Sequence, residues 1–187
     1  MTDQTLAARL DRIESTQALQ MLPSRYALAV DSRDVDTLVD LFVEDVDAGK
    51  WGKGRTGLRA FYESVLTGFY RSQHQICGHV FDFADDDHAS GAVYCRAEHE
   101  SGDDWVVMIM TYFDDYERHD GRWLFRRRFP GFFYATNIDE RPRAPFACWP
   151  GREQNPKHFP GSHAYATWMP YWDRQDPAVF DAITRQR

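Results

Sequence analysis

The stretch Trp105–Tyr134 contains two runs of apolar and aromatic residues separated by Asp120-Gly121. An Asp-Gly pair between two such runs is the strongest short-range signal for a β-hairpin with a two-residue turn. The pattern therefore predicts two long antiparallel strands that pair with each other on either side of this turn.

A two-residue turn also predicts the register of the hairpin. Counted outward from the turn, Tyr116 lies opposite Phe125 and Tyr112 lies opposite Phe129. Side chains alternate between the two faces of a strand, so one face collects aromatic and sulfur-containing side chains: Met108, Met110, Tyr112, Tyr116, Trp123, Phe125 and Phe129. A face of this kind needs an apolar cover, which the remainder of the chain must supply.

Helical periodicity dominates the sequence before residue 73. Residues 3–20 carry aliphatic residues at helical spacing: Leu6, Leu10 and Ile13. Pro23 suits the first turn of a helix better than its interior, so the pattern predicts a second helix that starts there and ends near Asp31.

The pattern then changes from helices to strands. Asp34 is expected to cap a third helix, and a fourth is expected over residues 58–66 with Thr56 as its N-cap. Two strands are expected at Gln73–Ala84 and Gly91–Glu100, ahead of the hairpin. Helices followed by long antiparallel strands indicate an α+β domain, with helices packed on one face of a curved sheet.

A change in composition after Ile138 divides the chain into an expected domain, residues 1–138, and a C-terminal extension, residues 139–187. The extension holds seven of the nine prolines, yet it is rich in aromatic residues: Phe146, Trp149, Phe159, Tyr165, Trp168, Tyr171 and Trp172. Disordered tails are poor in aromatic residues. We therefore expect an arm that packs on the domain or on a neighbouring subunit, with a flexible tail as the alternative.

Charge and cysteine content narrow the range of functions. The net charge is −7 and the only dense basic run, Arg126–Arg128, lies inside a strand pattern, so nucleic-acid and anionic-membrane partners are disfavoured. No run approaches ~20 apolar residues and the N-terminus lacks a signal-peptide core, which indicates a cytoplasmic protein. Three cysteines without metal-type spacing, Cys77, Cys95 and Cys148, are expected to be reduced and mostly buried.

Several segments together resemble the SnoaL-like branch of the nuclear transport factor 2 superfamily. They are RYALAVDSRD, VDTLVDLFVEDV, a lone strand histidine, His74, and YFDDYERHDGRWLFRRR, and the similarity covers roughly residues 8–137. The resemblance implies a cone, in which a strongly bent antiparallel or mixed sheet wraps around the N-terminal helices and encloses an apolar pocket. It also implies a trimer or dimer. The scaffold hosts many activities and also binding proteins, so the fold alone assigns no function.

Two groups of lyases within this family, the scytalone-dehydratase-like and dehydrochlorinase-like proteins, pair an Asp at the end of an early helix with a strand His. The resemblance places this pair at Asp31 and His74. It places a second pocket histidine, 25 residues after the first, at His99. It places an arginine, five residues after the hairpin tryptophan, at Arg128.

These residue types suit proton abstraction from carbon. An imidazole with a pKa near ~6.5 accepts a proton at neutral pH, and a carboxylate on its other nitrogen fixes the tautomer. His74 would be the base, Asp31 its partner, and Arg128 a site for a developing anion. The groups available to polarise a carbonyl or protonate a departing hydroxyl are His99, Tyr26 and Tyr62. The sequence has no recognisable motif for a nucleophile, a phosphate loop or a metal site, which leaves cofactor-free proton transfer or elimination.

If the family resemblance is set aside, the same residues allow simpler interpretations. Asp31 lies about 180° around an ideal helix from the apolar Leu22, so it would be a solvated charge at a helix end. His74 would be an ordinary strand histidine, and His79 and His99 would be core residues with satisfied hydrogen bonds.

Arg128 lies opposite Phe113 in the simple hairpin register, on the face away from the aromatic side chains. It reaches the pocket only if a bulge shifts the strand, and Phe129–Gly131 is a plausible place because proline and glycine favour such irregularities. In the simple register Asp114 lies opposite Arg127, and it would be no more than the cross-strand ion-pair partner of that residue.

The sequence thus leads to one main hypothesis and two alternatives. The main hypothesis is a cofactor-independent lyase of the dehydratase type acting on a small apolar cyclic or aromatic molecule. The alternatives are a proton-transfer enzyme resembling ketosteroid isomerases or polyketide cyclases, and a non-catalytic ligand-binding or assembly module. The enzyme hypotheses require the Asp31 carboxylate within ~3 Å of a His74 ring nitrogen, beside an apolar cavity.

Overall fold

Three helices, four long strands and a short C-terminal helix build the described part of the chain. The computed structural model describes residues 5–142 and 164–179. The elements in order are α1 (Leu6–Asp31), α2 (Val35–Asp40), the 3-10 helix η1 (Gly49–Trp51), α3 (Gly54–Leu66), β1 (Arg71–Phe83), β2 (His88–Ser101), β3 (Asp104–His119), β4 (Arg122–Asn137) and α4 (Trp168–Trp172).

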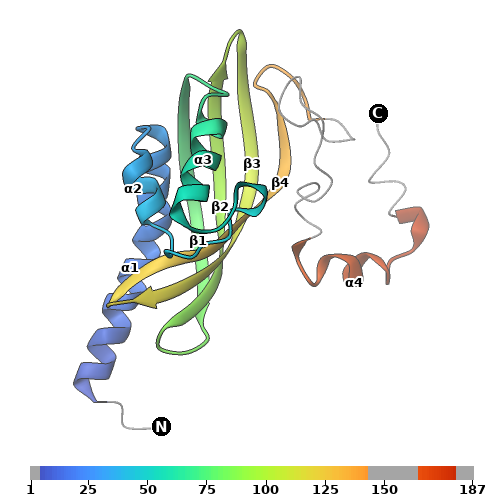
Figure 1. Cartoon of the computed structure of the whole chain (residues 1–187). Coiled ribbons are helices and arrows are strands. Elements are labelled where there is room, and N and C mark those ends of the chain that lie inside the picture. Colours follow the sequence, from blue (N-terminus) through green and yellow to red (C-terminus); the bar gives the residue numbers. More distant parts are fainter. Residues whose placement is uncertain (1–4, 143–163, 180–187) are drawn as a thin grey trace.

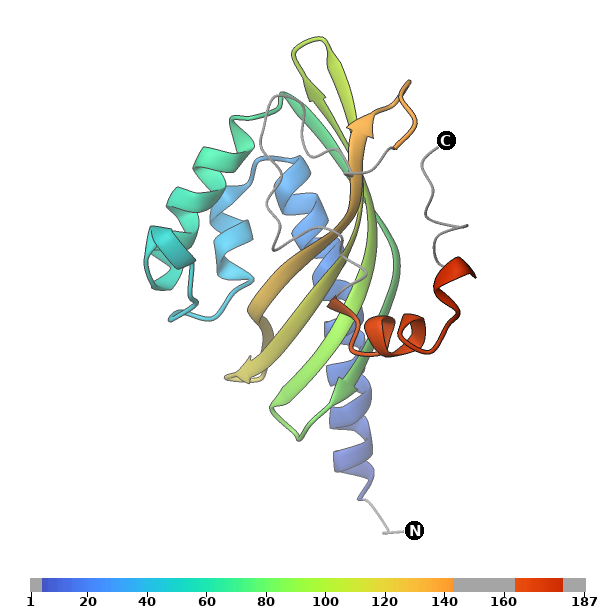
Figure 2. The same ribbon diagram turned by 90° about the vertical axis from the view of Figure 1, so that its right-hand side faces the viewer.

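The four strands form one antiparallel sheet in the order β1-β2-β3-β4. The sheet is strongly curved, and α1, α2 and α3 lie on its concave side (Figure 1). The view turned by 90° shows α4 on the opposite, convex side (Figure 2). This arrangement confirms the expected α+β class, with helices on one face of a curved sheet. None of the helices in the described ranges has the length and apolar character needed to span a membrane.

Helix α1 is continuous, and the expectation of two helices separated at Pro23 is wrong. Pro23 lies inside the helix and is itself buried. Residues before and after it bury the same face against the sheet: Leu19, Leu22, Tyr26, Ala29 and Val30. A proline in a helix interior costs ~3 kcal/mol or more. Burial of several side chains on both sides of it, at ~1.5–3 kcal/mol each, outweighs that cost.

The expected helix start at Asp34 is confirmed, whereas the expected start at Thr56 is not. The Asp34 side chain caps α2, because its Oδ1 accepts a hydrogen bond from the backbone N–H of Thr37 at 3.0 Å. The N-cap position of helix α3 is Lys53, three residues earlier than predicted. Gly54 there has a φ of 80°, a left-handed conformation that favours glycine.

The hairpin turn forms as the sequence predicts. Asp120 and Gly121 have φ angles of 49° and 77°, the left-handed conformations that a type I′ turn requires at both central positions. Tyr116 pairs with Phe125, again as predicted.

Beyond that pair the predicted register is wrong, because β4 contains an extra residue. Arg126 has no partner on β3, and the pairs from Arg127 to Phe132 are shifted by one. A second irregularity at Phe133 shifts the pairs from Tyr134 onward once more. Tyr112 therefore lies opposite Pro130 rather than Phe129. The shift moves Phe129 off the face it was expected to share with Tyr112, and moves Arg128 onto that face. A bulge at an arginine, between Phe125 and Arg127, lacks the Gly or Pro signal that marks many bulges in a sequence.

The concave face of the sheet and the helices share one apolar core. Its centre is a cluster of aromatic rings from both layers: Tyr26, Phe42, Tyr62, Tyr112 and Phe125. Neighbouring ring centroids lie 5.0 to 6.4 Å apart at tilted or edge-to-face angles, the usual range for packed aromatic rings.

Part of the C-terminal extension contacts the convex face. The Tyr165 hydroxyl lies 3.0 Å from Thr111 Oγ1 and donates to the Tyr94 hydroxyl at 3.3 Å. Its ring centroid is 5.3 Å from that of Phe113. Several residues singled out in the sequence lie outside the described residues: Phe146, Cys148, Trp149 and Phe159. Of the other two cysteines, Cys95 is buried and Cys77 is exposed.

Candidate functional site

Asp31 and His74 make a two-point contact between the end of α1 and β1. The Asp31 Oδ1 atom lies 2.7 Å from His74 Nδ1, and Asp31 Oδ2 accepts a hydrogen bond of 2.7 Å from the His74 backbone N–H. The side chains are 16% and 7% exposed, respectively. Simultaneous bonding to backbone and ring fixes the carboxylate relative to the imidazole, a geometry suited to orienting a base.

Ser72 and Arg33 extend this contact, and neither was identified from the sequence. Ser72 Oγ donates to Asp31 Oδ1 at 2.7 Å and accepts from Arg33 Nη1 at 3.1 Å. A guanidinium can only donate, so the Ser72 hydroxyl must direct its own hydrogen to the carboxylate. Arg33 also bonds backbone carbonyls at the end of α1 and just before β1: Val30, Phe69 and Tyr70. The alternation of side chains along a strand places Ser72 on the same face as His74, so the sequence could have indicated Ser72. No comparable pattern in the sequence points to Arg33.

Hydrogen bonding determines the protonation state of Asp31 and the tautomer of His74. Burial acts to raise the pKa of the Asp31 carboxyl, but hydrogen bonds from His74 and Ser72 outweigh it and lower the pKa below its usual value. The carboxylate is therefore ionised at neutral pH and accepts a hydrogen bond from the Nδ1–H group of His74. In the neutral imidazole, Nε2 then carries the free lone pair. This is the tautomer that a general base needs.

His99 lies beside His74 on the neighbouring strand. Their ring centroids are 5.4 Å apart with the ring planes at 90°, and the Phe69 ring lies 4.7 Å from His99 on another side. His99 is 4% exposed. Burial, followed by the charge of nearby His74, lowers the pKa of His99 to about 3. His99 is thus a neutral imidazole at neutral pH and cannot act as a cationic acid.

This shift predicts a pH dependence of stability. Because the pKa of His99 is about 3 in the folded chain and near 6.5 for a histidine surrounded by water, the unfolded chain binds more protons between those values. The free energy of unfolding should therefore fall as the pH decreases through that window. His99→Gln should make this slope shallower in urea titrations at several pH values. The exposed His88, whose pKa is raised by a hydrogen bond to Asp85, provides the control His88→Gln. Equal slopes for wild type and His99→Gln would contradict the assignment.

Arg128 reaches the concave interior and pairs with Asp114, so the sequence-based pairing of Asp114 with Arg127 is wrong. Arg128 Nε and Nη2 donate to the two Asp114 oxygens at 2.9 and 2.6 Å, and the side chains are 3% and 0% exposed. The bulge at Arg126 causes this change, because the extra residue reverses which of the following β4 side chains point into the interior. The predicted bulge position at residues 129–131 was therefore too far along the strand.

Aromatic rings surround the Arg128 guanidinium. Its central carbon lies 4.3 Å from the ring centroid of Tyr26 and 4.2 Å from those of Tyr112 and Phe125, distances typical of cation–π contacts. Nη1 of Arg128 is buried and has no hydrogen-bond partner in the described part of the chain. Tyr26 accepts a long hydrogen bond of 3.4 Å from the Tyr62 hydroxyl, and burial raises the pKa of Tyr26.

The five candidate residues thus form two groups on the concave side of the sheet. In one group His74 contacts both Asp31 and His99, and in the other Tyr26 contacts Arg128. Cys95 on β2 is linked electrostatically to both groups. Burial raises the pKa of its thiol to about 12, while Arg128 acts to lower it and Asp31 to raise it. A neutral thiol at this position is an apolar side chain between the two groups.

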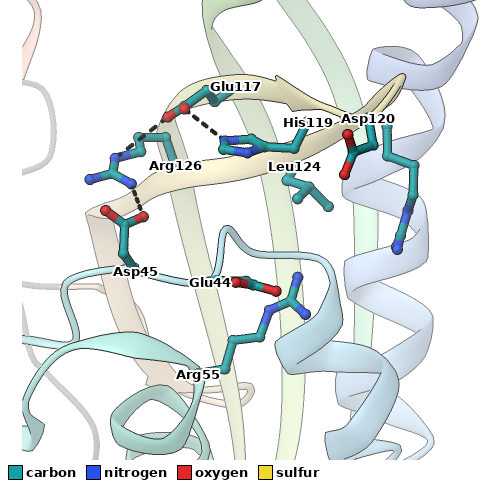
Figure 3. A pocket seen from close by; sticks show the side chains of 9 residues that line it. Glu44, Asp45, Arg55, Glu117, His119, Asp120, Leu124 and Arg126 are labelled. Carbon is teal, nitrogen blue, oxygen red and sulfur yellow. Dashed lines mark hydrogen bonds and ion pairs between the residues drawn. The ribbon is translucent and has the colours of Figure 1, made fainter.

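A separate, polar cavity of about 670 Å³ lies at the turn between β3 and β4 (Figure 3). Its lining residues are Glu44, Asp45, Arg55, Glu117, His119, Asp120, Arg122, Leu124 and Arg126. Arg126 lies between Asp45 and Glu117 and pairs with both. None of the five candidate residues lines this cavity. In residues 5–142 and 164–179, no group of three or more His, Cys, Asp or Glu side chains is placed to hold a metal ion.

Comparison with known proteins relates this chain to lyase-type enzymes. The gamma-hexachlorocyclohexane dehydrochlorinase of Sphingobium indicum is 29% identical over 126 residues, which cover 64% of this chain and 81% of that protein. The crystal structure of LinA superposes with a TM-score of 0.64 at 28% identity, covering 73% of this chain and 98% of that chain.

A scytalone-dehydratase-like protein from Novosphingobium aromaticivorans superposes with a TM-score of 0.61 at 24% identity, covering 77% of this chain and 98% of that chain. This similarity concerns the fold and confirms the expected NTF2-like architecture. The sequence pattern of the SnoaL-like domain matches residues 11–129, more than half of the chain. The chain therefore belongs to the SnoaL-like domain family and is a distant relative of lyase-type enzymes.

Proposed function

We propose that this protein is a cofactor-independent lyase that removes a proton from carbon in a small apolar cyclic or aromatic substrate. The observation that supports this proposal most directly is the Asp31–His74 contact, with 2.7 Å between Oδ1 and Nδ1. It leaves Nε2 of a nearly buried imidazole as the free base. The dehydrochlorinase of Sphingobium indicum supports elimination as the reaction class.

Each residue has a defined role in this proposal. Nε2 of His74 takes the proton, and the ionised Asp31 stabilises the imidazolium that forms. The electron pair of the broken C–H bond forms the new double bond as the leaving group departs from the adjacent carbon. His99 and Tyr26 polarise the departing group, and the Tyr26 hydroxyl can protonate it. The unpaired Nη1 of Arg128 stabilises negative charge that develops there.

Asp31→Asn is expected to lower turnover about 10²- to 10⁴-fold, because an amide does not hold His74 in the required tautomer or stabilise the imidazolium. The assay uses γ-hexachlorocyclohexane, followed by chloride release, and a cyclic β-hydroxy ketone, followed by the absorbance of the conjugated product. The exposed Asp85 forms a similar pair with His88, so Asp85→Asn is the control and should retain wild-type turnover.

Undiminished turnover in Asp31→Asn would refute the role of the pair. Wild-type protein that exchanges a substrate C–H for deuterium in D₂O without releasing a leaving group would instead support the isomerase-like alternative. Wild-type protein that binds these molecules without either reaction would support a binding module.

A further inference from the structure

Helix α1 is apolar on two opposite faces, and the described residues 5–142 and 164–179 cover only one of them. The covered face packs on the sheet and includes Leu19, Leu22, Tyr26, Ala29 and Val30. The opposite face carries five large apolar side chains that are between 48% and 79% exposed: Leu6, Leu10, Ile13, Met21 and Leu28. We call these five residues the outer stripe.

The outer stripe runs along almost the whole helix, with Gln17 and Ser24 between its apolar members. At ~100° of rotation per residue, its members lie within an arc of about 80°, and from Leu6 to Leu28 they span about 33 Å. Figures 1 and 2 both show the N-terminal end of α1 extending beyond the ends of the strands. Single exposed apolar residues are common on monomers, whereas five large ones on one face of a helix indicate an interaction surface.

Ion pairs prevent the helix from turning this stripe inward. Asp11 of α1 binds Arg118 of β3 through two hydrogen bonds of 2.7 and 3.0 Å. Arg12, on the next position, binds Asp86 in the β1–β2 turn at 3.1 Å and lies over the Phe83 ring at 4.0 Å. These contacts fix the N-terminal half of α1 against the sheet, so the outer stripe stays directed away from the protein.

The stripe is complementary to itself, and we propose that it is the interface with a second copy of this chain. Two α1 helices would pack antiparallel about a two-fold axis near residue 19. Leu10 would then pack against Leu28 of the partner subunit, and Ile13 against Ser24 of the partner subunit. Met21 would pack against Gln17 of the partner subunit. Each of these facing pairs contains at least one large apolar side chain, as the interface between two packed helices requires.

The charges beside the stripe favour the same arrangement. Glu14 and Arg25 are both exposed and flank the stripe on the same side of α1. In the antiparallel pair Glu14 faces Arg25 of the partner subunit, and the two-fold axis makes this ion pair twice. A membrane surface is a poorer occupant, because interfacial helices are flanked by basic residues, whereas here an acidic residue lies in the flank and the chain carries a net charge of −7.

Sedimentation velocity of the full chain over a range of concentrations tests the proposal. Wild-type protein should associate in the micromolar range, and the double variant Leu10→Glu, Ile13→Glu should not. The matched control is Val80→Glu on β1, which replaces an apolar residue of 68% exposure away from the stripe; it should associate like wild type. Circular dichroism checks that each variant is folded. A monomeric wild type, or association unaffected by the stripe variants, would overturn the proposal.

Charge reversal tests the antiparallel geometry. Glu14→Arg alone should weaken association about tenfold, because two attractive pairs become repulsive. Combining it with Arg25→Glu should restore association to the wild-type level, since the pairs are re-formed with opposite polarity. Failure of the combined variant to associate better than Glu14→Arg would exclude this arrangement of the two helices.

Discussion

Replacing His74 by alanine is expected to reduce turnover of an elimination substrate about 10²- to 10⁴-fold, the contribution of a well-placed general base. The expectation rests on the bonding of the pair. Asp31 occupies Nδ1 and the backbone N–H of His74, so the only free basic atom of the dyad is Nε2. His99 cannot take over this role, because its low pKa, about 3, makes it a very weak base.

Chemical rescue separates a base from a structural residue. Added imidazole should restore part of the activity of His74→Ala, and the rescued rate should show a primary isotope effect when the abstracted hydrogen is deuterium. His88 provides a matched control, since its Nδ1 lies 2.9 Å from Asp85 Oδ1 in an exposed pair. His88→Ala should therefore keep wild-type turnover. A folded His74→Ala protein with full activity would remove the base from the mechanism.

Local sequence patterns predict the turns and helix caps of this fold, because interactions between residues close in sequence determine them. The Asp120-Gly121 turn follows from the left-handed φ angles that these residues tolerate. The Asp34 cap follows from a side chain that satisfies a free N–H of α2. By contrast, the continuity of α1 through Pro23 depends on tertiary burial of one face, which a window of local sequence does not contain.

The candidate site is less predictable, because its geometry arises between distant segments. Residue types alone make Asp31 a solvated charge, and only the family resemblance pairs it with His74. Ser72 and Arg33 acquire their roles when the start of β1 meets the end of α1. The direction of the Arg128 side chain depends on one extra residue in β4, Arg126. No proline or glycine at that position indicates the bulge in the sequence.

That inserted residue leads to the largest expected effect on stability. It places Arg128 opposite Asp114 in the interior, with side chains that are 3% and 0% exposed. Asp114→Asn leaves the guanidinium buried without its counter-charge, and is expected to lower the free energy of unfolding by about 3–5 kcal/mol. Urea unfolding followed by tryptophan fluorescence measures this value. The next pair on the same strands, Asp115 with Arg127, is 50% and 61% exposed at 3.6 Å, so Asp115→Asn should cost less than about 1 kcal/mol.

A double-mutant cycle shows whether the cost comes from the unpaired charge. Asp114→Asn with Arg128→Met removes both charges and keeps an acceptor for the Tyr116 hydroxyl, which donates to Asp114 Oδ2 at 2.9 Å. The double variant should recover most of the lost stability, because a methionine suits the surrounding aromatic rings. A double variant as unstable as Asp114→Asn alone would show that the cost lies in packing. A small effect of Asp114→Asn would show that water reaches Arg128. In that case its guanidinium would be screened, and would lose the low-dielectric surroundings that make it an effective site for a developing anion.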